Sequence, residues 1–214
     1  MSTPEPKKVA IYIDGFNLYH AIHDLKRPHL KWLNLFTLGT KLLRDGEALE
    51  KVHFFTTVVD WNAPKRTRHQ TYLMALAAKG VKISHGNFKK ASRHCSQHDR
   101  HCPFREEKQT DVAIGVQIVA DAFKGTFERM ILLTADTDQI PAVEMVKREF
   151  PNKDITWLAP PGRMQQAREL GDLITDRSEL SSGMIQNCRL PRVVMDAQQN
   201  IVCSMPNEYA APNS

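Results

Sequence analysis

Four aspartates lie where the sequence predicts the ends of parallel strands or the start of a helix. Ligands of open α/β sheets bind at the carboxyl ends of the strands, so these acids are expected at one edge of a sheet. Four carboxylates brought together repel one another unless a cation lies between them, since isolated buried charges are costly. Hard oxygen ligands favour Mg²⁺ or Mn²⁺, which also bind phosphate oxygens. The predicted metal ligands are Asp14, Asp111, Asp136 and Asp138.

A metal ion at this edge would lower the pKa of a bound water and stabilise charge developing on a phosphodiester. Asn17, one turn into the first expected helix, is predicted to orient that water or a phosphate. Gly15 is predicted to allow a sharp turn between Asp14 and Asn17. The alternative for each acid alone is a helix cap or a dipole partner, but their joint placement favours catalysis. The predicted catalytic group is Asp14, Asn17, Asp111, Asp136 and Asp138.

The elements that must position these residues alternate between strands and helices. Mainly apolar segments predict five strands, at residues 9–13, 51–60, 81–88, 129–135 and 154–159. The spacing of apolar residues predicts a helix directly after Asp14 and further helices at residues 33–43, 66–79, 110–123, 139–150 and 164–170. In the helix at 110–123 the expected buried stripe is Val112, Val116, Val119 and Phe123. This alternation predicts an α/β three-layer sandwich around a mainly parallel five-stranded sheet, with residues 173–175 weighed as a short edge strand.

Residues 89–109 interrupt this alternation. They carry KK, RHCSQHDRHC and REEK, contain almost no aliphatic side chains, and are expected to form an insertion or long loop. We expect a flexible N-terminus at residues 1–6, one domain at 7–180 that carries the insertion, and a C-terminal extension at 181–214. In that extension two short β segments are expected around a polar turn at 197–200, with disorder from Tyr209 onward.

A patch rich in cysteine and histidine lies inside this insertion. His94, Cys95, His98, His101 and Cys102 lie within nine consecutive positions. Two cysteines with two histidines could bind tetrahedral Zn²⁺, here through Cys95, His98, His101 and Cys102. The spacing departs from the common zinc-finger pattern, and the alternative is a solvated polar loop that brings histidines toward RNA.

Basic and aromatic side chains are expected to surround the acids. Phosphate contacts of basic residues are independent of sequence and sensitive to salt, and aromatic rings can stack on unpaired bases. The candidates for phosphate contacts are Lys65, Arg66, Arg68, Lys89, Lys90, Arg93 and Arg163. The candidates for stacking are Tyr19, Trp61 and Phe88. The alternative is that these are solvated cations and half-buried aromatic residues.

The composition is that of a globular protein. Lys plus Arg number 29 against 24 for Asp plus Glu, which gives a net charge of +5 and is compatible with nucleic acid as a partner. No apolar run approaches the length of a membrane span, and the polar start MSTPEPKK lacks the apolar stretch of a signal peptide. We therefore expect a cytoplasmic protein without a membrane partner; a homodimer is left open.

Three segments, IDGFNLYH, EEKQTDVAIG and LLTADTDQIP, resemble in that order the signature blocks of the NYN domain family. The resemblance covers roughly residues 7–176, and the tail LPRVV…IVCSMP is similar to that of a bacterial subgroup. It implies a PIN-like (Rossmannoid) parallel sheet, a Mg²⁺ or Mn²⁺ site and ribonuclease activity. The positions that match the family's acidic and polar residues are Asp14, Asn17, Asp111, Asp136 and Asp138, with Glu107 and Lys108 as weaker candidates.

The sequence departs from the family pattern beside the acids without replacing any of them. Thr134 and Ala135 stand where Ser-Gly is common, and Gln139 stands where an aromatic residue is common. The leading hypothesis is a metal-dependent endoribonuclease. A non-catalytic RNA-binding or adaptor protein on the same fold is the alternative. A phosphatase ranks last, because it needs a second acid two residues after the first, and Asn17 is three residues after Asp14.

The zinc hypothesis is tested by replacing both cysteines of the patch. If Cys95 and Cys102 ligate zinc, the double variant Cys95→Ser, Cys102→Ser loses the bound zinc that elemental analysis finds in the wild-type protein. An unchanged zinc content contradicts the hypothesis.

Overall fold

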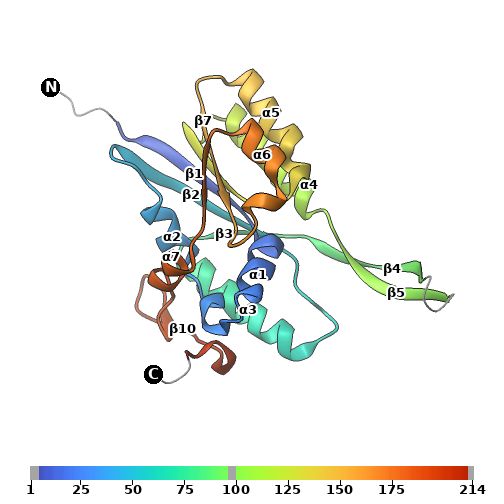
Figure 1. Cartoon of the computed structure of the whole chain (residues 1–214). Coiled ribbons are helices and arrows are strands. Elements are labelled where there is room, and N and C mark those ends of the chain that lie inside the picture. Colours follow the sequence, from blue (N-terminus) through green and yellow to red (C-terminus); the bar gives the residue numbers. More distant parts are fainter. Residues whose placement is uncertain (1–4, 96–99, 212–214) are drawn as a thin grey trace.

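The computed structural model describes residues 5–95 and 100–211, and within 87–108 it describes the backbone but not the side chains of 89–91 and 93–107. Its centre is a six-stranded sheet in the order β3-β2-β1-β6-β7-β8, in which every neighbouring pair is parallel (Figure 1). The strands are β1 (Lys7–Asp14), β2 (Glu47–Thr56), β3 (Lys82–His85), β6 (Arg129–Leu133), β7 (Asp154–Ala159) and β8 (Asp176–Glu179).

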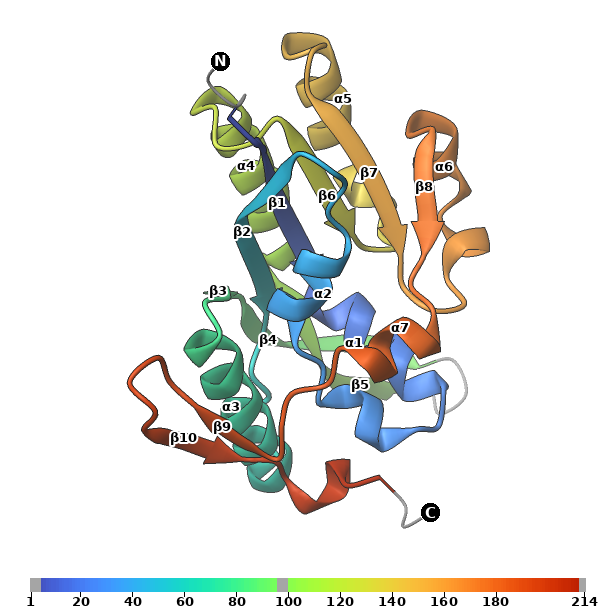
Figure 2. The same ribbon diagram turned by 90° about the vertical axis from the view of Figure 1, so that its left-hand side faces the viewer.

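Helices cover both faces of this sheet, so the predicted three-layer α/β fold is confirmed (Figure 2). One layer contains α1 (Gly15–Asp24), α2 (Leu35–Lys41), α3 (Ala63–Ala78) and α7 (Ser182–Asn187). The other layer contains α4 (Thr110–Phe123), α5 (Ile140–Glu149) and α6 (Arg168–Leu173). Short 3-10 turns lie at η1 (Pro28–Lys31), η2 (Thr137–Gln139), η3 (Met164–Gln166) and η4 (Asn207–Tyr209).

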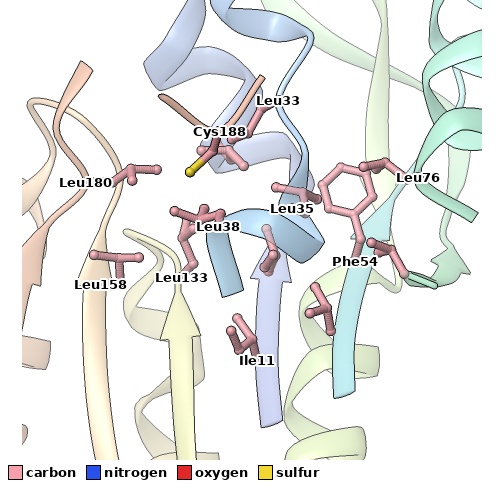
Figure 3. Packing of buried hydrophobic residues seen from close by; sticks show 14 of the residues in the cluster. Ile11, Leu33, Leu35, Leu38, Phe54, Leu76, Leu133, Leu158, Leu180 and Cys188 are labelled. Carbon is pink, nitrogen blue, oxygen red and sulfur yellow. The ribbon is translucent and has the colours of Figure 1, made fainter. Parts of the chain in front are cut away.

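The central strand β1 is apolar along most of its length because it is covered on both faces. Successive side chains of a strand point to opposite faces. Ile11 and Ile13 therefore join the cluster under α1, α2 and α3, part of which is drawn in Figure 3, whereas Ala10 and Tyr12 join the cluster under α4 and α5. Both clusters fix the strand that ends in the first aspartate.

The strand order reverses direction at β1. The chain builds β2 and β3 on one side of β1 and then crosses over to build β6, β7 and β8 on the other. Ligands of such sheets bind outside the carboxyl ends of the strands at this switch point. Ile13 pairs with Leu133, so the residues that follow β1 and β6 leave the sheet side by side.

The second strand is shifted from its predicted position. It spans residues 47–56 instead of 51–60 because it pairs with the whole of β1, from Lys7 opposite Glu47 to Asp14 opposite Phe55. The predicted strand end at Asp60 is therefore wrong: Asp60 lies in the loop between β2 and α3, beyond the edge of the sheet.

The expected edge strand at 173–175 is also wrong, because α6 extends to Leu173 and the sixth strand follows at β8. Leu170, Leu173 and Ile174 have the helical spacing i, i+3, i+4 and pack in one cluster. This packing favours a helix at the position where a strand was expected. β8 has the sequence DRSE and is mostly exposed, so it lacks the apolar residues that would have predicted it.

The segment 89–109 is not the irregular loop that was expected. Apart from residues 96–99 it forms an antiparallel pair, β4 (Asn87–Cys95) and β5 (Arg100–Lys108), which projects away from the three layers (Figure 1). The sequence of this segment shows no alternation of apolar residues, so periodicity did not predict the two strands.

The buried face of α4 is not the predicted one, although Val119 of the predicted stripe packs against the core. Ile114, Ile118 and Ala122 are buried, whereas Val112 and Phe123 are 70% and 61% exposed. The helix carries apolar residues at the same spacing on both sides, so periodicity alone cannot choose between them. The predicted β segments of the C-terminal extension are confirmed as the antiparallel strands β9 (Val193–Met195) and β10 (Ile201–Ser204).

The expected disorder from Tyr209 onward is wrong for Tyr209 itself. Its ring lies 6.3 Å from that of Trp32, on the side of the molecule where β10 contacts α3. Within residues 5–95 and 100–211, none of the helices has the length and apolar character needed to span a membrane.

Gly15 allows a close approach of two elements and not, as predicted, a special turn. Its backbone is not among those with positive φ. A Cβ atom at this position would lie 2.5 Å from the backbone oxygen of Phe55 and 2.6 Å from the ring of Phe54. The start of α1 thus lies directly against the end of β2, and this contact fixes where Asp14 ends its strand.

Gly15→Ala is therefore expected to lower the free energy of unfolding by roughly 1–3 kcal/mol, because the backbone of β2 cannot move aside. Urea denaturation measures the change. The matched control is Gly183→Ala in α7, where the nearest atom is 3.9 Å away and the helix gains up to about 1 kcal/mol. Equal stability of the Gly15→Ala variant and the wild type would show that α1 and β2 are not in this contact.

Candidate functional site

Three aspartates meet at the switch point of the sheet. Carboxylate oxygens of Asp14, Asp111 and Asp136 all lie within 4.8 Å of one another. Asp14 ends β1, Asp136 follows β6, and Asp111 lies in the first turn of α4. Asp14 is buried, Asp136 is half-buried and Asp111 is exposed, so the group opens from the sheet toward solvent. This donor set and spacing are able to hold a divalent metal ion.

The carboxylate of Asp14 is held by four hydrogen bonds from neutral donors. Its Oδ1 accepts from the backbone N–H groups of Phe16 and Asn17, at 3.1 and 3.0 Å, and so caps α1. Its Oδ2 accepts from Asn17 Nδ2 at 2.5 Å and from Thr134 Oγ1 at 2.9 Å. A carboxylate has about four lone-pair positions. A metal ion at Asp14 would therefore replace one of these donors, and the side-chain amide of Asn17 is the more exposed of the two on Oδ2.

The side chains of Asp121 and Glu47 are buried as well, but among the described residues Asp14 differs from them in forming no ion pair. Asp121 pairs with Lys51, and Glu47 pairs with Arg129 at 2.5 Å. Burial opposes ionisation of both, but these partners prevail and lower the pKa of each carboxyl. Within the described residues Asp14 forms no ion pair, and carboxylate oxygens of Asp111 and Asp136 lie within 4.8 Å of its own.

Burial therefore raises the pKa of Asp14, and repulsion by Asp136 raises it further. Hydrogen bonds from Asn17 and Thr134 oppose this shift but do not reverse it. An acid whose pKa is higher in the folded than in the unfolded state makes folding less favourable as the pH rises through the folded pKa. A bound cation would offset this cost, because it interacts only with the ionised form.

Asp138 does not belong to this group of three acids. It lies in the 3-10 turn η2, its side chain is exposed, and its backbone N–H donates to Asp136 Oδ1 at 2.9 Å. The bond fixes the orientation of the Asp136 carboxylate. Direct metal ligation by Asp138 stays a prediction.

The two departures from the family pattern support the acids directly. Thr134 is buried beside Asp14 and donates its hydroxyl to that carboxylate. Gln139 is also buried, and its Nε2 donates to the backbone oxygen of Asp111 at 3.0 Å. The bond ties the start of α4 to the turn that carries Asp136 and thereby holds two of the three acids together.

A pocket of about 340 Å³ adjoins the acids between α1, the end of β2 and α3. Aromatic rings form much of its wall, and three cations reach it. The described residues that line it are Gly15, Phe16, Leu18, Tyr19, His20, Ile22, Lys31, Phe54, Thr56, Thr57, Val59, Trp61, Lys65, Arg68, His69, Tyr72, Phe88 and Tyr209.

Several of the predicted substrate contacts meet in this pocket. The predicted stacking residues Tyr19, Trp61 and Phe88 all line it, as do the predicted phosphate contacts Lys65 and Arg68. Trp61 packs edge-on against Phe88, with their ring centroids 4.8 Å apart.

The remaining predicted contacts lie elsewhere. Arg66 is exposed on α3 outside the pocket lining, and Arg163 forms an ion pair with Asp24 at the end of α1. Lys108 is exposed at the end of β5, two residues before α4. The other predicted site residues have side chains that lie outside the described part of the structure, and their roles stay predictions. They are Lys89, Lys90, Arg93, His94, Cys95, His98, His101, Cys102 and Glu107.

Sequence reasoning missed several members of the pocket and of the acid site. Phe16 and Thr134 each lie within two residues of a predicted catalytic aspartate, and this proximity could have singled them out. Nothing in the sequence pointed to Tyr209, because it reaches the pocket from a distant segment that the Arg68–Glu208 ion pair holds against α3.

A six-stranded parallel sheet with acids at its switch point defines a PIN-like, nuclease-like α/β domain. The NYN domain family model matches residues 8–170, and the chain belongs to the NYN domain family. The match runs from β1 into α6 and includes all three aspartates.

Two known proteins are similar to this chain over most of its length. A 6-hydroxy-3-succinoylpyridine 3-monooxygenase from Pseudomonas putida is 26% identical, over 89% of this chain and 72% of that protein. A crystal structure of a Vibrio parahaemolyticus protein of unknown function superimposes with a TM-score of 0.55 at 16% identity, over 85% of this chain and 98% of that one. The second likeness bears on the fold alone.

Metal binding is expected to raise the melting temperature of the wild-type protein. Mn²⁺ at 100 times its Kd stabilises the folded state by about 2.7 kcal/mol, which corresponds to roughly 5–10 °C for a chain of this size. Asp14→Asn is expected to raise the melting temperature of the metal-free protein, because it removes a buried charge, and to abolish the response to Mn²⁺.

Differential scanning calorimetry with EDTA and with Mn²⁺ measures both effects. The matched control is Asp45→Asn, which removes an exposed acid from the turn before β2, at the opposite edge of the sheet, and keeps the full response. A response to Mn²⁺ that survives in Asp14→Asn would place the metal elsewhere.

Proposed function

We propose that the protein is a metal-dependent endoribonuclease that hydrolyses RNA phosphodiesters at Asp14, Asp111 and Asp136. The observation that carries this proposal is the buried carboxylate of Asp14, which faces two other carboxylates and forms no ion pair with any residue that the structure describes. Membership of the NYN domain family, with its nuclease-like fold, supports the same class of chemistry. The metal is Mg²⁺ or Mn²⁺, because all the available ligand atoms are hard oxygens.

When bound, the divalent ion supplies Lewis-acid activation of a water and neutralises charge on the phosphate. Asp14 holds the inner side of the site, since its position is fixed by the α1 cap and by Thr134. Asp136, which follows β6, and Asp111, in the first turn of α4, would hold the ion from two other sides. Asn17 has its amide within hydrogen-bond reach of Asp14, where it can orient the attacking water or a phosphate oxygen.

The two competing hypotheses from the sequence rank lower. A non-catalytic RNA-binding protein would not need to keep a buried, unpaired carboxylate, because that charge costs stability and an adaptor gains nothing from it. A phosphatase with an aspartyl nucleophile would need Asp14 to attack the phosphate. That chemistry also needs a second acid two residues after the nucleophile, and the residue at that position is Phe16.

A second candidate function comes from the Pseudomonas putida relative, whose name assigns it monooxygenation of a substituted pyridine. The aromatic pocket beside the acids is also suited to a planar ring with an acidic substituent. On this hypothesis the protein binds a small hydroxylated aromatic acid. The hypothesis predicts that oxygen is consumed when such an acid and a two-electron reductant are supplied, and that RNA is not cleaved.

The nuclease proposal predicts that labelled single-stranded RNA is cut in Mn²⁺ or Mg²⁺ and remains intact in EDTA. Asp136→Asn is expected to reduce the rate by at least about 100-fold, since it removes one ligand charge from the site. Asp45→Asn serves as the control that retains wild-type activity, and circular dichroism shows whether each variant is folded.

Equal cleavage by wild type and Asp136→Asn would identify a contaminating nuclease and overturn the proposal. RNA that is bound but not cut with any divalent metal would favour the adaptor hypothesis.

A further inference from the structure

Three aromatic side chains around the pocket are unusually exposed for their type. Phe16, Tyr19 and Trp61 are 45%, 43% and 48% exposed, and all three line the same cavity. Exposed apolar surface gathered in one place marks an interaction site, whereas isolated exposed residues need no explanation. The floor beneath them is apolar and buried, formed by residues such as Leu18 and Ile22. The cavity is thus shaped and lined for a planar, apolar-faced group.

The charge of the pocket has one sign. Lys31, Lys65 and Arg68 line it, and none of the described lining residues is acidic. Burial lowers the pKa of both histidines of the pocket, to about 4 for His69, so they are neutral at pH 7. Arg68 pairs with Glu208, which lies outside the pocket lining, so the positive charge comes mainly from Lys31 and Lys65. The occupant that fits is a planar aromatic ring attached to an anionic group.

Polar groups deep in the pocket suit the edge of a heterocyclic ring. The hydroxyls of Thr56 and Thr57 lie on residues that are 4% and 7% exposed, and His69 Nε2 lies 3.2 Å from Thr56 Oγ1. Neutral imidazole and hydroxyl groups both donate and accept hydrogen bonds. A nucleobase presents donors and acceptors of this kind along its edges.

The pocket is continuous with the aspartate site on two sides. Gly15 and Phe16 belong to its wall and directly follow Asp14 in the chain. On the other side, Thr57 Oγ1 lies 3.2 Å from the hydroxyl of Thr110, the residue before Asp111. A group held in the pocket would thus lie beside the segments that carry Asp14 and Asp111.

We propose that this pocket holds a single unpaired base of the RNA, belonging to a nucleotide that flanks the cut phosphodiester. The inference rests on the proposed function for the cleavage itself. A base inside a duplex is stacked and paired, and it would have to be flipped out to enter. The substrate class is therefore RNA that is unpaired at the cut site, and its complement suppresses cleavage by occupying that base.

Binding is tested without metal or cleavage, through the fluorescence of Trp61. The other tryptophans, Trp32 and Trp157, are buried. In EDTA, AMP is expected to quench the emission in a saturable way and to lose this effect in Trp61→Phe, whereas ribose 5-phosphate causes no quenching. Absence of saturable quenching by AMP overturns the proposal. Quenching by a pyridine carboxylic acid but not by AMP would do the same, and would favour the second candidate function.

The position of the base is tested by cleavage of an RNA with one preferred cut site, in which each nucleotide in turn is replaced by an abasic one. A loss of about 5- to 150-fold in rate is expected at one position beside the cut, with little change elsewhere, because stacking is worth about 1–3 kcal/mol per base. Tyr19→Ala is expected to remove that positional effect. Phe36→Ala, which truncates a ring that is 40% exposed and does not line the pocket, retains it.

The outcomes separate the two proposals. If every abasic RNA is cleaved at the normal rate in Mn²⁺, the nuclease proposal stands and the base pocket is overturned. Saturable AMP quenching in a protein that cuts no RNA overturns the nuclease proposal and supports the base pocket.

Discussion

Burial of the Asp14 carboxylate at the end of the central strand imposes the main constraint on this site. Asp121 and Glu47 are also buried, and the fold supplies each with a basic partner. Asp14 instead receives only neutral donors and faces two further carboxylates. Three carboxylates this close together destabilise the folded protein when no metal is bound. A bound cation would remove that cost. Catalytic sites are often sources of such strain, because function and stability place different demands on the same residues.

The fold places the acids by simple means. The switch in strand order brings the ends of β1 and β6 together, and the absence of a side chain at Gly15 lets α1 start against β2. Gln139 then ties the start of α4 to the turn after β6. The residues directly after Asp14 also form part of the wall of the aromatic pocket, so the pocket lies beside the acids. Cleavage chemistry and base recognition would therefore share one structural element, the start of α1.

Much of this arrangement could be predicted from the sequence. Long apolar runs such as 9–13 and 154–159 indicated the strands, and the rule that ligands bind at strand ends indicated the aspartates. The predictions failed where the local sequence fits more than one structure and tertiary packing selects between them. The two sides of α4 are both apolar, β8 has almost no apolar residues, and the end of β2 is fixed by pairing with β1. Tyr209 could not be predicted at all, because only tertiary contacts bring it to the pocket.

The central claim is that a divalent cation binds among Asp14, Asp111 and Asp136. The most direct measurement is a crystal structure of the protein grown with Mn²⁺, with diffraction data recorded at the manganese absorption edge. The account predicts an anomalous peak in contact with carboxylate oxygens of all three residues, with the Asn17 amide displaced from Asp14. Fully ordered carboxylates with no manganese between them at saturating Mn²⁺ would contradict it.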